Sequence, residues 1–461
     1  MSKCKAFYAA FLWIAILLNF NTTILAQEER AKVEAVTKWL ANNAISLRSV
    51  KAGSGFEDLQ PLKKVFQGVR IVGLGEATHG TREFFQFKHR LLEFLVKEMN
   101  FKVLAIETGY SSSADINDYI LGKSNDVGKA LEHQGFWVWD TEEMREMLDW
   151  MRSYNASVPQ EKKVRIVGFD IHYNEPAKQR ILSYLRRVAP ERVAESEAFF
   201  KSEIEKLVET AYFTKDKQER VDALAKITEA RTKYNELLGF LVLNEISFAE
   251  QTSIAEFNQI RDYARVLAQL ADAYDRPLDE AGGAPRDYYM AENIKRLVAD
   301  ESPNSRIIVW AHNSHISMGR ESARYPLMGF HLRRFFGRAY YALGFSFNQG
   351  SFQARDFNPK ANREVMQFTV SPAPEGSVDW YFTRVGIKNY FVDLRQPAKS
   401  DTVARWLSTP HPMRVIGSYY NSQAEKNYFI PVTLKQDFDG IMFFDRTTRA
   451  HPNPSVKNVA S

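Results

Sequence analysis

Cysteine is almost missing from this chain of 461 residues, because Cys4 is the only one. The G-x-S-x-G elbow of serine hydrolases does not occur, and neither do the glycine patterns of P-loop and dinucleotide-binding proteins. An excess of one charge is lacking too, since 61 basic and 56 acidic residues leave a net charge of +5. These absences argue against a serine-elbow enzyme, a nucleotide-dependent enzyme and a nucleic-acid partner.

The first 26 residues have the pattern of a secretory signal peptide. Lys3 and Lys5 give a positive start, Ala6–Phe20 is mostly apolar, and cleavage can follow Ala26. The apolar run is shorter than a membrane span usually needs, so an uncleaved anchor is the weaker alternative. Cleavage would remove Cys4 and exclude disulfides, thiolate zinc sites and a cysteine nucleophile. We therefore expect a secreted or periplasmic protein with no stable membrane insertion.

The remaining chain has the composition of a protein with a large packed core, with 45% hydrophobic and 13% aromatic residues. Short apolar runs alternate with amphipathic helical segments, which predicts an α/β fold with a mainly parallel central sheet flanked by helices. The expected strands are Val69–Leu74, Val103–Glu107, Val164–Asp170, Arg306–Trp310, Ala339–Phe347, Tyr390–Leu394, Met413–Ser418 and Gly440–Phe444.

The stretch from Pro176 to Asp275 is rich in Glu, Lys, Ala and Leu and nearly free of glycine. It predicts long helices inserted into the sheet domain, and the breaker-rich segment Arg276–Pro285 closes it. We expect this insertion to form a lid over the carboxyl ends of the strands that moves to admit substrate. The expected organisation is a signal peptide (1–26), a first core part (27–175), the helical insertion (176–285) and a second core part (286–461).

The most informative motif is GLGEATHG, residues Gly73–Gly80. An apolar strand ends here, Glu76 follows it, and His79 comes three residues later, before an amphipathic helix. If the helix begins directly after Gly75, the two side chains lie one turn apart beside its N-terminus, which favours an anion or a developing oxyanion. For either residue alone, a helix cap or a surface histidine is the alternative.

Three further expected strands end in acidic or imidazole side chains, which are Glu107, Asp170, and the pair His312 and His315. Open α/β sheets bind ligands at the carboxyl ends of their strands, so four such ends predict an active site. Glu107 is expected beside Glu76, where a carboxylate pair would raise one pKa and suit acid–base work. A structural role is favoured for Asp170.

His312 and His315 belong to the turn AHNSH, directly after an apolar strand. They can be metal ligands, or an acid–base group with an oxyanion donor, or buried histidines of a capped turn. No HExxH or cysteine spacing supports the metal. Lys88, on the helix after His79, can point back toward the site or belong to a solvated charged face.

Two tryptophans in the segment QGFWVWDTEEM, Trp137 and Trp139, are candidates for the wall of an apolar substrate pocket. Packing in the core is the alternative role for such a pair.

At these residues the chain resembles the erythromycin esterase family, hydrolases that open the macrolactone ring of macrolide antibiotics. The resemblance extends from about Leu62 to Phe444, and the combination of G-E-x-x-H with A-H-N-x-H is specific. It implies one α/β fold with a helical insertion over a deep cleft, and hydrolysis without a covalent enzyme intermediate. The matching stretches are Gly75–Leu95, Ala105–Tyr110, Gly168–Ile171, Arg286–Ile294, Val309–Ile316, MG followed by Leu332, and Glu375–Trp380.

The resemblance also implies roles for the residues of these motifs. His79 corresponds to the general base that activates water, Glu76 and Glu107 to essential cleft carboxylates, and His312 to a second essential histidine. His315 matches the second imidazole of the turn. No cofactor is implied.

One position departs from the family pattern. Lys88 stands where the members whose activity defines the family carry arginine, and lysine keeps the charge without the planar fork. We expect Lys88 and His312 to stabilise the tetrahedral oxyanion.

The expected function is therefore a carboxylic ester hydrolase that opens macrolides such as erythromycin and confers antibiotic resistance, with a small ester and water as its reactants. One alternative is a metal-dependent hydrolase of another substrate that uses the same Glu and His cluster with zinc or manganese. The other is a non-catalytic envelope protein that binds a polyketide, polysaccharide or haem-like ligand in the cleft.

Overall fold

The computed structural model of the protein describes residues 27–201, 203–275, 283–301, 304–319, 325–357 and 364–453. The expected signal peptide and most of the breaker-rich segment after the helical stretch lie outside these ranges. No helix of the described ranges is long and apolar enough to cross a membrane.

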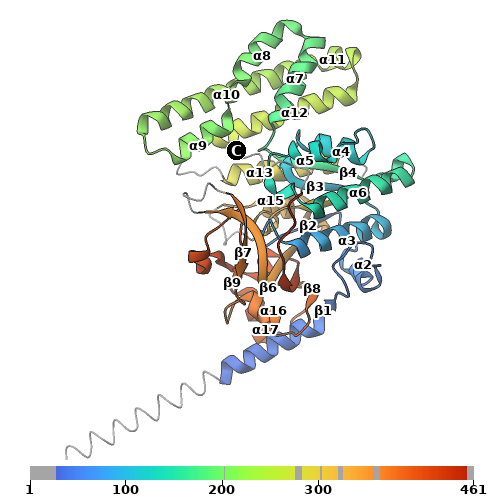
Figure 1. Cartoon of the computed structure of the whole chain (residues 1–461), viewed down its shortest axis with the longest axis vertical. Coiled ribbons are helices and arrows are strands. Elements are labelled where there is room, and N and C mark those ends of the chain that lie inside the picture. Colours follow the sequence, from blue (N-terminus) through green and yellow to red (C-terminus); the bar gives the residue numbers. More distant parts are fainter. Residues whose placement is uncertain are drawn as a thin grey trace, which may run out of the picture.

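Ten of the described strands form one central sheet (Figure 1). Along the sheet they are β1 (Ala44–Ser46), β8 (Asn389–Asp393), β12 (Gly440–Thr447), β6 (Tyr340–Asp356), β2 (Ile71–Leu74), β5 (Arg306–Trp310), β3 (Phe101–Gly109) and β4 (Arg165–Asp170), with β7 (Val365–Val370) and β10 (Tyr419–Tyr420) also paired to β6. The six strands from β12 to β4 are parallel to their neighbours, whereas β1, β7 and β8 pair antiparallel. The expected mainly parallel α/β sheet is confirmed.

The central strands are buried on both faces, as their nearly continuous apolar runs indicate. Side chains of a strand alternate between the two faces. Accordingly, Ile308 and Trp310 of β5 join one apolar cluster, while Ile307 and Val309 join the other. Each face is therefore covered by its own helical layer.

The first layer contains α3 (Arg82–Met99), α4 (Ser113–Ile120), α5 (Val127–Glu132) and α6 (Glu142–Ser157). The second contains the helix over residues 27–43, α13 (Gly283–Asp300), α15 (Met328–Phe336), α16 (Val378–Thr383), α17 (Asp401–Ser408) and α18 (Leu434–Asp437). Two short helices, α2 (Leu62–Val65) and α14 (Asn313–Ile316), and a two-stranded sheet of β9 (His411–Arg414) and β11 (Phe429–Val432) complete the core.

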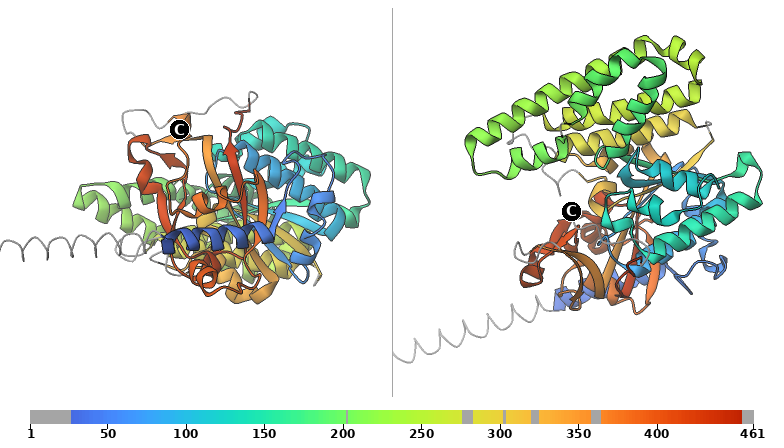
Figure 2. Two further views of the ribbon diagram at one scale, coloured as in Figure 1. Left: turned by 90° about the horizontal axis from the view of Figure 1, so that it is seen from below. Right: turned by 45° about the horizontal axis from the view of Figure 1, so that its top comes forward.

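Between β4 and β5 the described chain is helical throughout, which confirms the expected helical stretch. Its helices are α7 (Glu175–Val188), α8 (Val193–Phe200), α9 (Ile204–Phe213), α10 (Lys217–Leu243), α11 (Glu245–Gln251) and α12 (Ile254–Tyr274), followed by α13. They share an apolar core of their own. Figures 1 and 2 show α7–α12 gathered at one end of the molecule, beyond the sheet.

The helical stretch lies on the carboxyl-end side of the sheet. Directly after β4, the His172 imidazole contacts the Tyr274 hydroxyl of α12 (2.7 Å), and the Tyr173 backbone N–H donates to Glu205 of α9 (2.8 Å). The position is the one expected for a lid, and its movement stays a prediction.

Several expected boundaries were wrong. The helix after His79 begins at Arg82, so Glu76 and His79 belong to the loop that precedes it. The expected strand Met413–Ser418 is cut short, because β9 ends at Arg414. Strand β6 continues nine residues beyond Phe347 because it also pairs with β7 and β10.

Candidate active site

The four strands predicted to carry the site are neighbours in the sheet, in the order β2, β5, β3 and β4. Their carboxyl ends deliver Glu76, His312, Glu107 and Asp170 to one edge. A cavity of about 460 Å³ opens there, and its lining includes His79, Glu107, Arg286, His312 and His315. The convergence expected from the sequence is therefore present.

Glu76 is the anchor of the loop after β2. Its Oε1 lies 2.6 Å from His79 Nδ1, and its Oε2 accepts hydrogen bonds from Lys88 Nζ and Trp310 Nε1, each at 2.7 Å. Burial opposes ionisation of this carboxyl, but Lys88 and His79 outweigh it and lower its pKa to about 2. Glu76 is thus an ionised carboxylate that fixes the orientation of an imidazole.

The loop after β2 is held in place by the AHNSH turn after β5. Asn313 N–H donates to the Glu76 carbonyl (2.9 Å), while its side-chain amide bonds the backbone of Phe345 in both directions (2.7 and 3.0 Å). The two segments approach so closely that a Cβ on Gly75 would lie 2.1 Å from Asn313 Oδ1. Only glycine fits at that position.

His79 combines an oriented ring with a free nitrogen. Because the ionised Glu76 accepts from Nδ1, that nitrogen carries the proton and Nε2 presents its lone pair. No described residue hydrogen-bonds to Nε2, and the ring lines the cavity. This is the arrangement of a general base supported by a carboxylate.

Lys88 does not reach the cavity. Its ammonium is buried against Glu76, and it lies 4.1 Å from the centre of the Trp310 ring. Burial, only partly offset by Glu76, lowers its pKa to about 8. The expected contact between Lys88 and the oxyanion therefore does not fit the structure. Lys88 binds Glu76 and is not among the residues that line the cavity.

His312 is a neutral imidazole with both nitrogens engaged. Its Nδ1 accepts from the Ser314 backbone N–H (3.3 Å), so Nε2 carries the proton and donates to the Ile416 carbonyl (3.1 Å). Burial and the neighbouring His79 and His315 lower its pKa to about 3. In the cavity, His312 can act as an N–H donor but not as a base.

Glu107 receives three polar partners. Its Oε2 accepts from the His312 backbone N–H (2.9 Å), and its Oε1 lies 3.3 Å from both Arg286 Nη2 and His315 Nε2. Burial opposes ionisation, but His315, His79 and Arg286 together hold its pKa well below the ordinary value. The expectation that Glu76 and Glu107 form a carboxylate pair with one raised pKa was wrong, because the pKa values of both are lowered by positive neighbours.

Arg286 lines the cavity and is paired with the buried Asp170. The guanidinium donates from Nε to Asp170 Oδ1 (3.1 Å), from Nη2 to Oδ2, and also to Glu107. Asp170 is fully buried, and its pKa is lowered because Arg286 outweighs the effect of burial. The structural role favoured for Asp170 agrees with this pairing.

His315 is a cation rather than a base. Its Nδ1 bonds Asp287 (2.7 Å) and its Nε2 lies 3.3 Å from Glu107. These two carboxylates outweigh burial and raise its pKa to about 10. Arg286 Nη1 is also 3.3 Å from Nε2, but a protonated imidazole has no lone pair there, so we assign the Nε2 proton to Glu107.

The protonation and hydrogen bonds of His312 and His315 also bear on the metal-dependent alternative. Within the described ranges, no group of three or more His, Cys, Asp or Glu side chains is arranged to hold a metal ion. Metal ligation needs a neutral imidazole nitrogen with a lone pair. His315 is protonated and His312 has both nitrogens occupied, so the cluster fits acid–base chemistry better than a metal.

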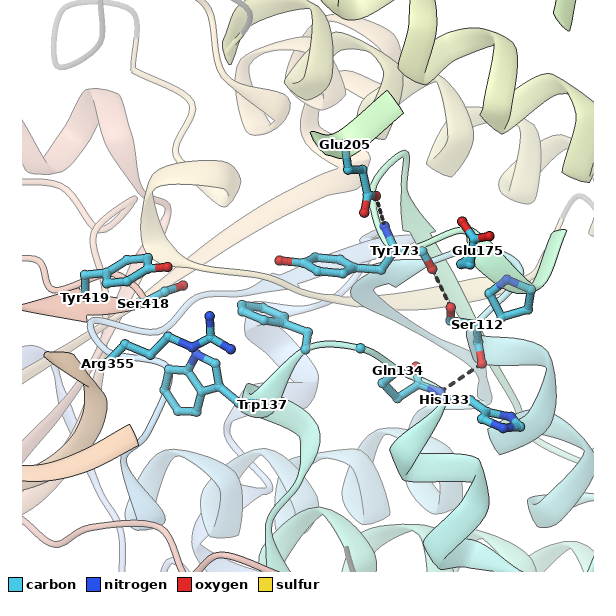
Figure 3. Close-up of a pocket in the computed structure, with 13 residues that line it drawn as sticks. Ser112, His133, Gln134, Trp137, Tyr173, Glu175, Glu205, Arg355, Ser418 and Tyr419 are labelled. Atoms are coloured by element: carbon cyan, nitrogen blue, oxygen red, sulfur yellow. Dashed lines mark hydrogen bonds between the residues drawn. The ribbon is translucent and has the colours of Figure 1, made fainter. Parts of the chain in front are cut away.

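The two tryptophans have different positions. Trp139 is buried in the core, where its Nε1 donates to the Glu107 carbonyl (3.3 Å) and its ring packs edge-on against Trp310. Trp137 lines a second cavity of about 390 Å³ (Figure 3). Trp139 thus has the alternative role of core packing, whereas Trp137 lies at a cavity, and its contact with a substrate stays a prediction.

Sequence reasoning missed Arg286, Asp287 and the aromatic pair Phe136 and Tyr173, which line or support the two cavities. The signal for the first two was present, because the Arg-Asp pair follows a breaker-rich segment directly and lies in the first turns of α13. Phe136 and Tyr173 carry no titratable chemistry near neutral pH, and only the fold brings them together.

Comparison with known proteins places these residues in context. The sequence model of the erythromycin esterase family matches residues 96–447. This range contains Glu107, Asp170, His312 and His315 but begins after His79, later than the expected start near Leu62.

Individual relatives extend the similarity over nearly the whole chain. Erythromycin esterase type II of Escherichia coli is 24% identical over 89% of this chain and 97% of its own. "Putative hydrolase YbfO" of Bacillus subtilis is 25% identical over 96% of this chain and 97% of its own. A solved structure of a Bacillus cereus protein superposes with a TM-score of 0.75 at 26% identity, covering 91% of this chain and 99% of that one.

Proposed function

Because this chain belongs to the erythromycin esterase family of hydrolases, we propose that it cleaves carboxylic esters with a water molecule activated by His79. The observation that carries the proposal is the His79 ring. Of the four imidazoles that line the cavity, it alone has an ionised carboxylate on one nitrogen and no partner among the described residues on the other, since His172 Nε2 is paired with the Tyr274 hydroxyl. In His312 and His315, both ring nitrogens already have partners.

The reaction follows from these positions. His79 Nε2 removes a proton from water, the water oxygen bonds to the ester carbonyl carbon, and Glu76 stabilises the imidazolium that forms. The tetrahedral oxyanion then collapses, the carbon–oxygen bond to the alcohol breaks, and the imidazolium returns the proton to the leaving alkoxide. The products are a carboxylic acid and an alcohol, with no covalent enzyme intermediate.

The oxyanion needs hydrogen-bond donors facing the cavity. Arg286 and the protonated His315 line it and carry positive charge. His312 offers its Nε2–H if the bond to the Ile416 carbonyl is exchanged for one to substrate. We assign hydrogen-bond donation to the oxyanion to Arg286 and His312. His315, whose two N–H groups bind Asp287 and Glu107, contributes its positive charge only, and Lys88 has a supporting role.

The proposed substrate is the macrolactone of erythromycin-type macrolides, and the proposed biological effect is antibiotic resistance. Support comes from the relatives named as erythromycin esterases and from the size of the two adjoining cavities. The test incubates the protein with erythromycin and with simple esters and follows their masses. Hydrolysis adds one water to the macrolactone; bound but unchanged ligands throughout the panel would favour the envelope binding protein instead.

We also propose that residues 1–26 direct export and that the mature enzyme is secreted or periplasmic. The support is the charged start, apolar run and small-residue cleavage site of the sequence. Intact-mass measurement of the protein from expressing cells tests this, since cleavage gives a mature chain that begins at Gln27, and a full-length cytoplasmic chain would contradict it.

A further inference from the structure

The last described residues form a segment that contacts two parts of the active site. Residues 448–453 follow β12 directly, and we call them the C-terminal strap. The family sequence model ends at residue 447, so the strap lies outside the range that it matches. The strap lines neither of the two cavities at the site. It is nevertheless packed against the core, because Ala450 is 0% and Asn453 3% exposed.

One half of the strap holds the loop that carries His79. The backbones of the three residues after His79 all pair with the strap: Gly80 with Ala450 (3.0 Å), Thr81 with Arg449 in an antiparallel bridge, and Arg82 with Thr448 (2.9 Å). The Gly80 carbonyl also accepts the Gln353 N–H of β6 (3.0 Å), and a Cβ on Gly80 would lie 2.2 Å from the Gln353 carbonyl oxygen. The loop is therefore held closely by the strap and by β6 together.

The other half of the strap holds residues 136–142, the segment that leads into α6. Three backbones of this segment pair with the strap: Asp140 with Asn453 (3.2 Å), Thr141 with Pro452 in an antiparallel bridge, and Glu142 with His451 (2.9 Å). At the start of the segment, the Phe136 ring packs edge-on against the His79 ring, with centres 5.7 Å apart. The strap thus joins the loop that carries His79 to the segment that packs on it.

A buried carboxylate adds a further connection between these two parts. Glu143 of α6 is 4% exposed, and its Oε2 accepts from the His451 backbone N–H (3.0 Å). Its Oε1 lies 3.1 Å from Arg82 Nε at the start of α3. One side chain therefore contacts the strap and the first turns of both helices. Supporting contacts of this kind decide how closely a catalytic side chain keeps its productive position.

We propose that the C-terminal strap positions His79, by keeping the loop that carries this residue and the segment that packs on it in fixed positions relative to each other. Glu76 orients the imidazole through its bond to Nδ1, whereas the strap fixes the backbone from which the ring projects. The strap residues line neither cavity, so they are positioning residues. The inference rests on the proposed hydrolysis at His79 and adds a second requirement for it, an intact C-terminal segment.

Ala450→Pro is the most direct perturbation, because proline has no N–H to donate and its ring occupies the place of that hydrogen. We expect amide hydrogen exchange at Arg82 and Glu142, whose N–H groups donate to the strap, to become at least about threefold faster. Ala373→Pro is the matched control and should leave both amides unchanged. It also replaces a buried alanine (7% exposed) whose N–H makes one hydrogen bond, to a side chain at 3.1 Å, but it lies in neither segment.

A second variant keeps the test decisive if Ala450→Pro does not fold. Glu143→Ala leaves the strap sequence intact and removes the carboxylate that holds the His451 N–H and Arg82. It should also speed exchange at the Arg82 and Glu142 amides. Circular dichroism shows whether each variant is folded.

Enzyme kinetics tests the consequence for catalysis. A misplacement of about 1 Å can cost about 10²-fold in rate, so kcat for the best ester substrate should fall at least about tenfold in Ala450→Pro. The same substitution added to His79→Ala should change kcat by less than about twofold, because the strap acts through His79. A strap that only stabilised the fold would lower kcat equally in both backgrounds. Ala373→Pro should leave kcat unchanged.

The possible results separate the strap from the hydrolysis. Unchanged exchange at both amides in folded Ala450→Pro and Glu143→Ala would overturn the inference. Faster exchange with wild-type kcat, or an equal loss of kcat with and without His79, would overturn the positioning role while ester hydrolysis stood. If the wild type cleaved no ester, the proposed hydrolysis would fail; faster exchange at both amides would then still support the strap as the connection between the two segments, and unchanged exchange would overturn it.

Discussion

The buried pair of Glu76 and Lys88 allows a quantitative prediction. The two charges lie 2.7 Å apart and both side chains are 1% exposed. Lowering the pKa of Glu76 from 4.5 to about 2 stabilises the folded state by about 3 kcal/mol at neutral pH. Lowering the pKa of Lys88 from 10.5 to about 8 costs about 3 kcal/mol below pH 8. Because the two nearly cancel, we expect the pair to position Glu76 rather than stabilise the fold.

A double-mutant cycle tests this expectation. Lys88→Met leaves a buried carboxylate without its cation and should lower the free energy of unfolding by about 3 to 5 kcal/mol. Glu76→Gln should also be costly, but the double variant should cost less than the sum of the two, by at least about 1 kcal/mol. Urea denaturation at pH 7, followed by circular dichroism, measures all four proteins.

The exposed pair Lys123 and Asp118 is the matched control, since its atoms lie 3.2 Å apart with side chains 64% and 46% exposed. Lys123→Met should change the free energy of unfolding by no more than about 1 kcal/mol. Additive costs in the Glu76 and Lys88 cycle, or a Lys88→Met variant as stable as the wild type, would refute the reasoning.

Three further predictions concern the rest of the site. The raised pKa of His315 contributes stability that is complete below pH 6.5 and is lost as the pH rises through about 10, so His315→Gln should be less stable than wild type at pH 6 and nearly equal to it above pH 10.5 in urea melts; a constant difference would contradict this. Dialysis against EDTA should leave ester hydrolysis unchanged, and loss of activity that zinc or manganese restores would instead support a metal enzyme. Tyr173→Gly should be more stable than Tyr173→Ala by about 1 kcal/mol, because only glycine adopts a φ of +57° without strain, and thermal unfolding of the two variants would expose the opposite order.

The core strands of the sheet could be predicted from the sequence because these strands are buried on both faces. Such strands are continuous apolar runs, and β5 was predicted at its observed bounds, Arg306–Trp310. The polar residue after each run was then a direct guide to the carboxyl edge of the sheet. What could not be predicted is that β5 inserts between β2 and β3, since strand order depends on contacts distant in sequence.

The division of roles within the site also required the structure. The motif GEATHG identified Glu76 and His79, but the spacing of Lys88 could not show that its ammonium lies behind Glu76 instead of in the cavity. Likewise, His312 and His315 look equivalent in AHNSH, yet their surroundings move their pKa values to about 3 and about 10. Burial and then His79 lower the pKa of His312, whereas Asp287 of α13 and Glu107 of β3 raise that of His315, and no local pattern contains these surroundings.

The most direct test of the account compares ester hydrolysis by the wild type and His79→Ala on the best substrate found, with circular dichroism confirming that both are folded. A positioned general base contributes about 10²- to 10⁴-fold, so the account predicts that kcat falls by at least about 100-fold in His79→Ala. A folded His79→Ala protein that hydrolysed the ester at the wild-type rate would contradict it.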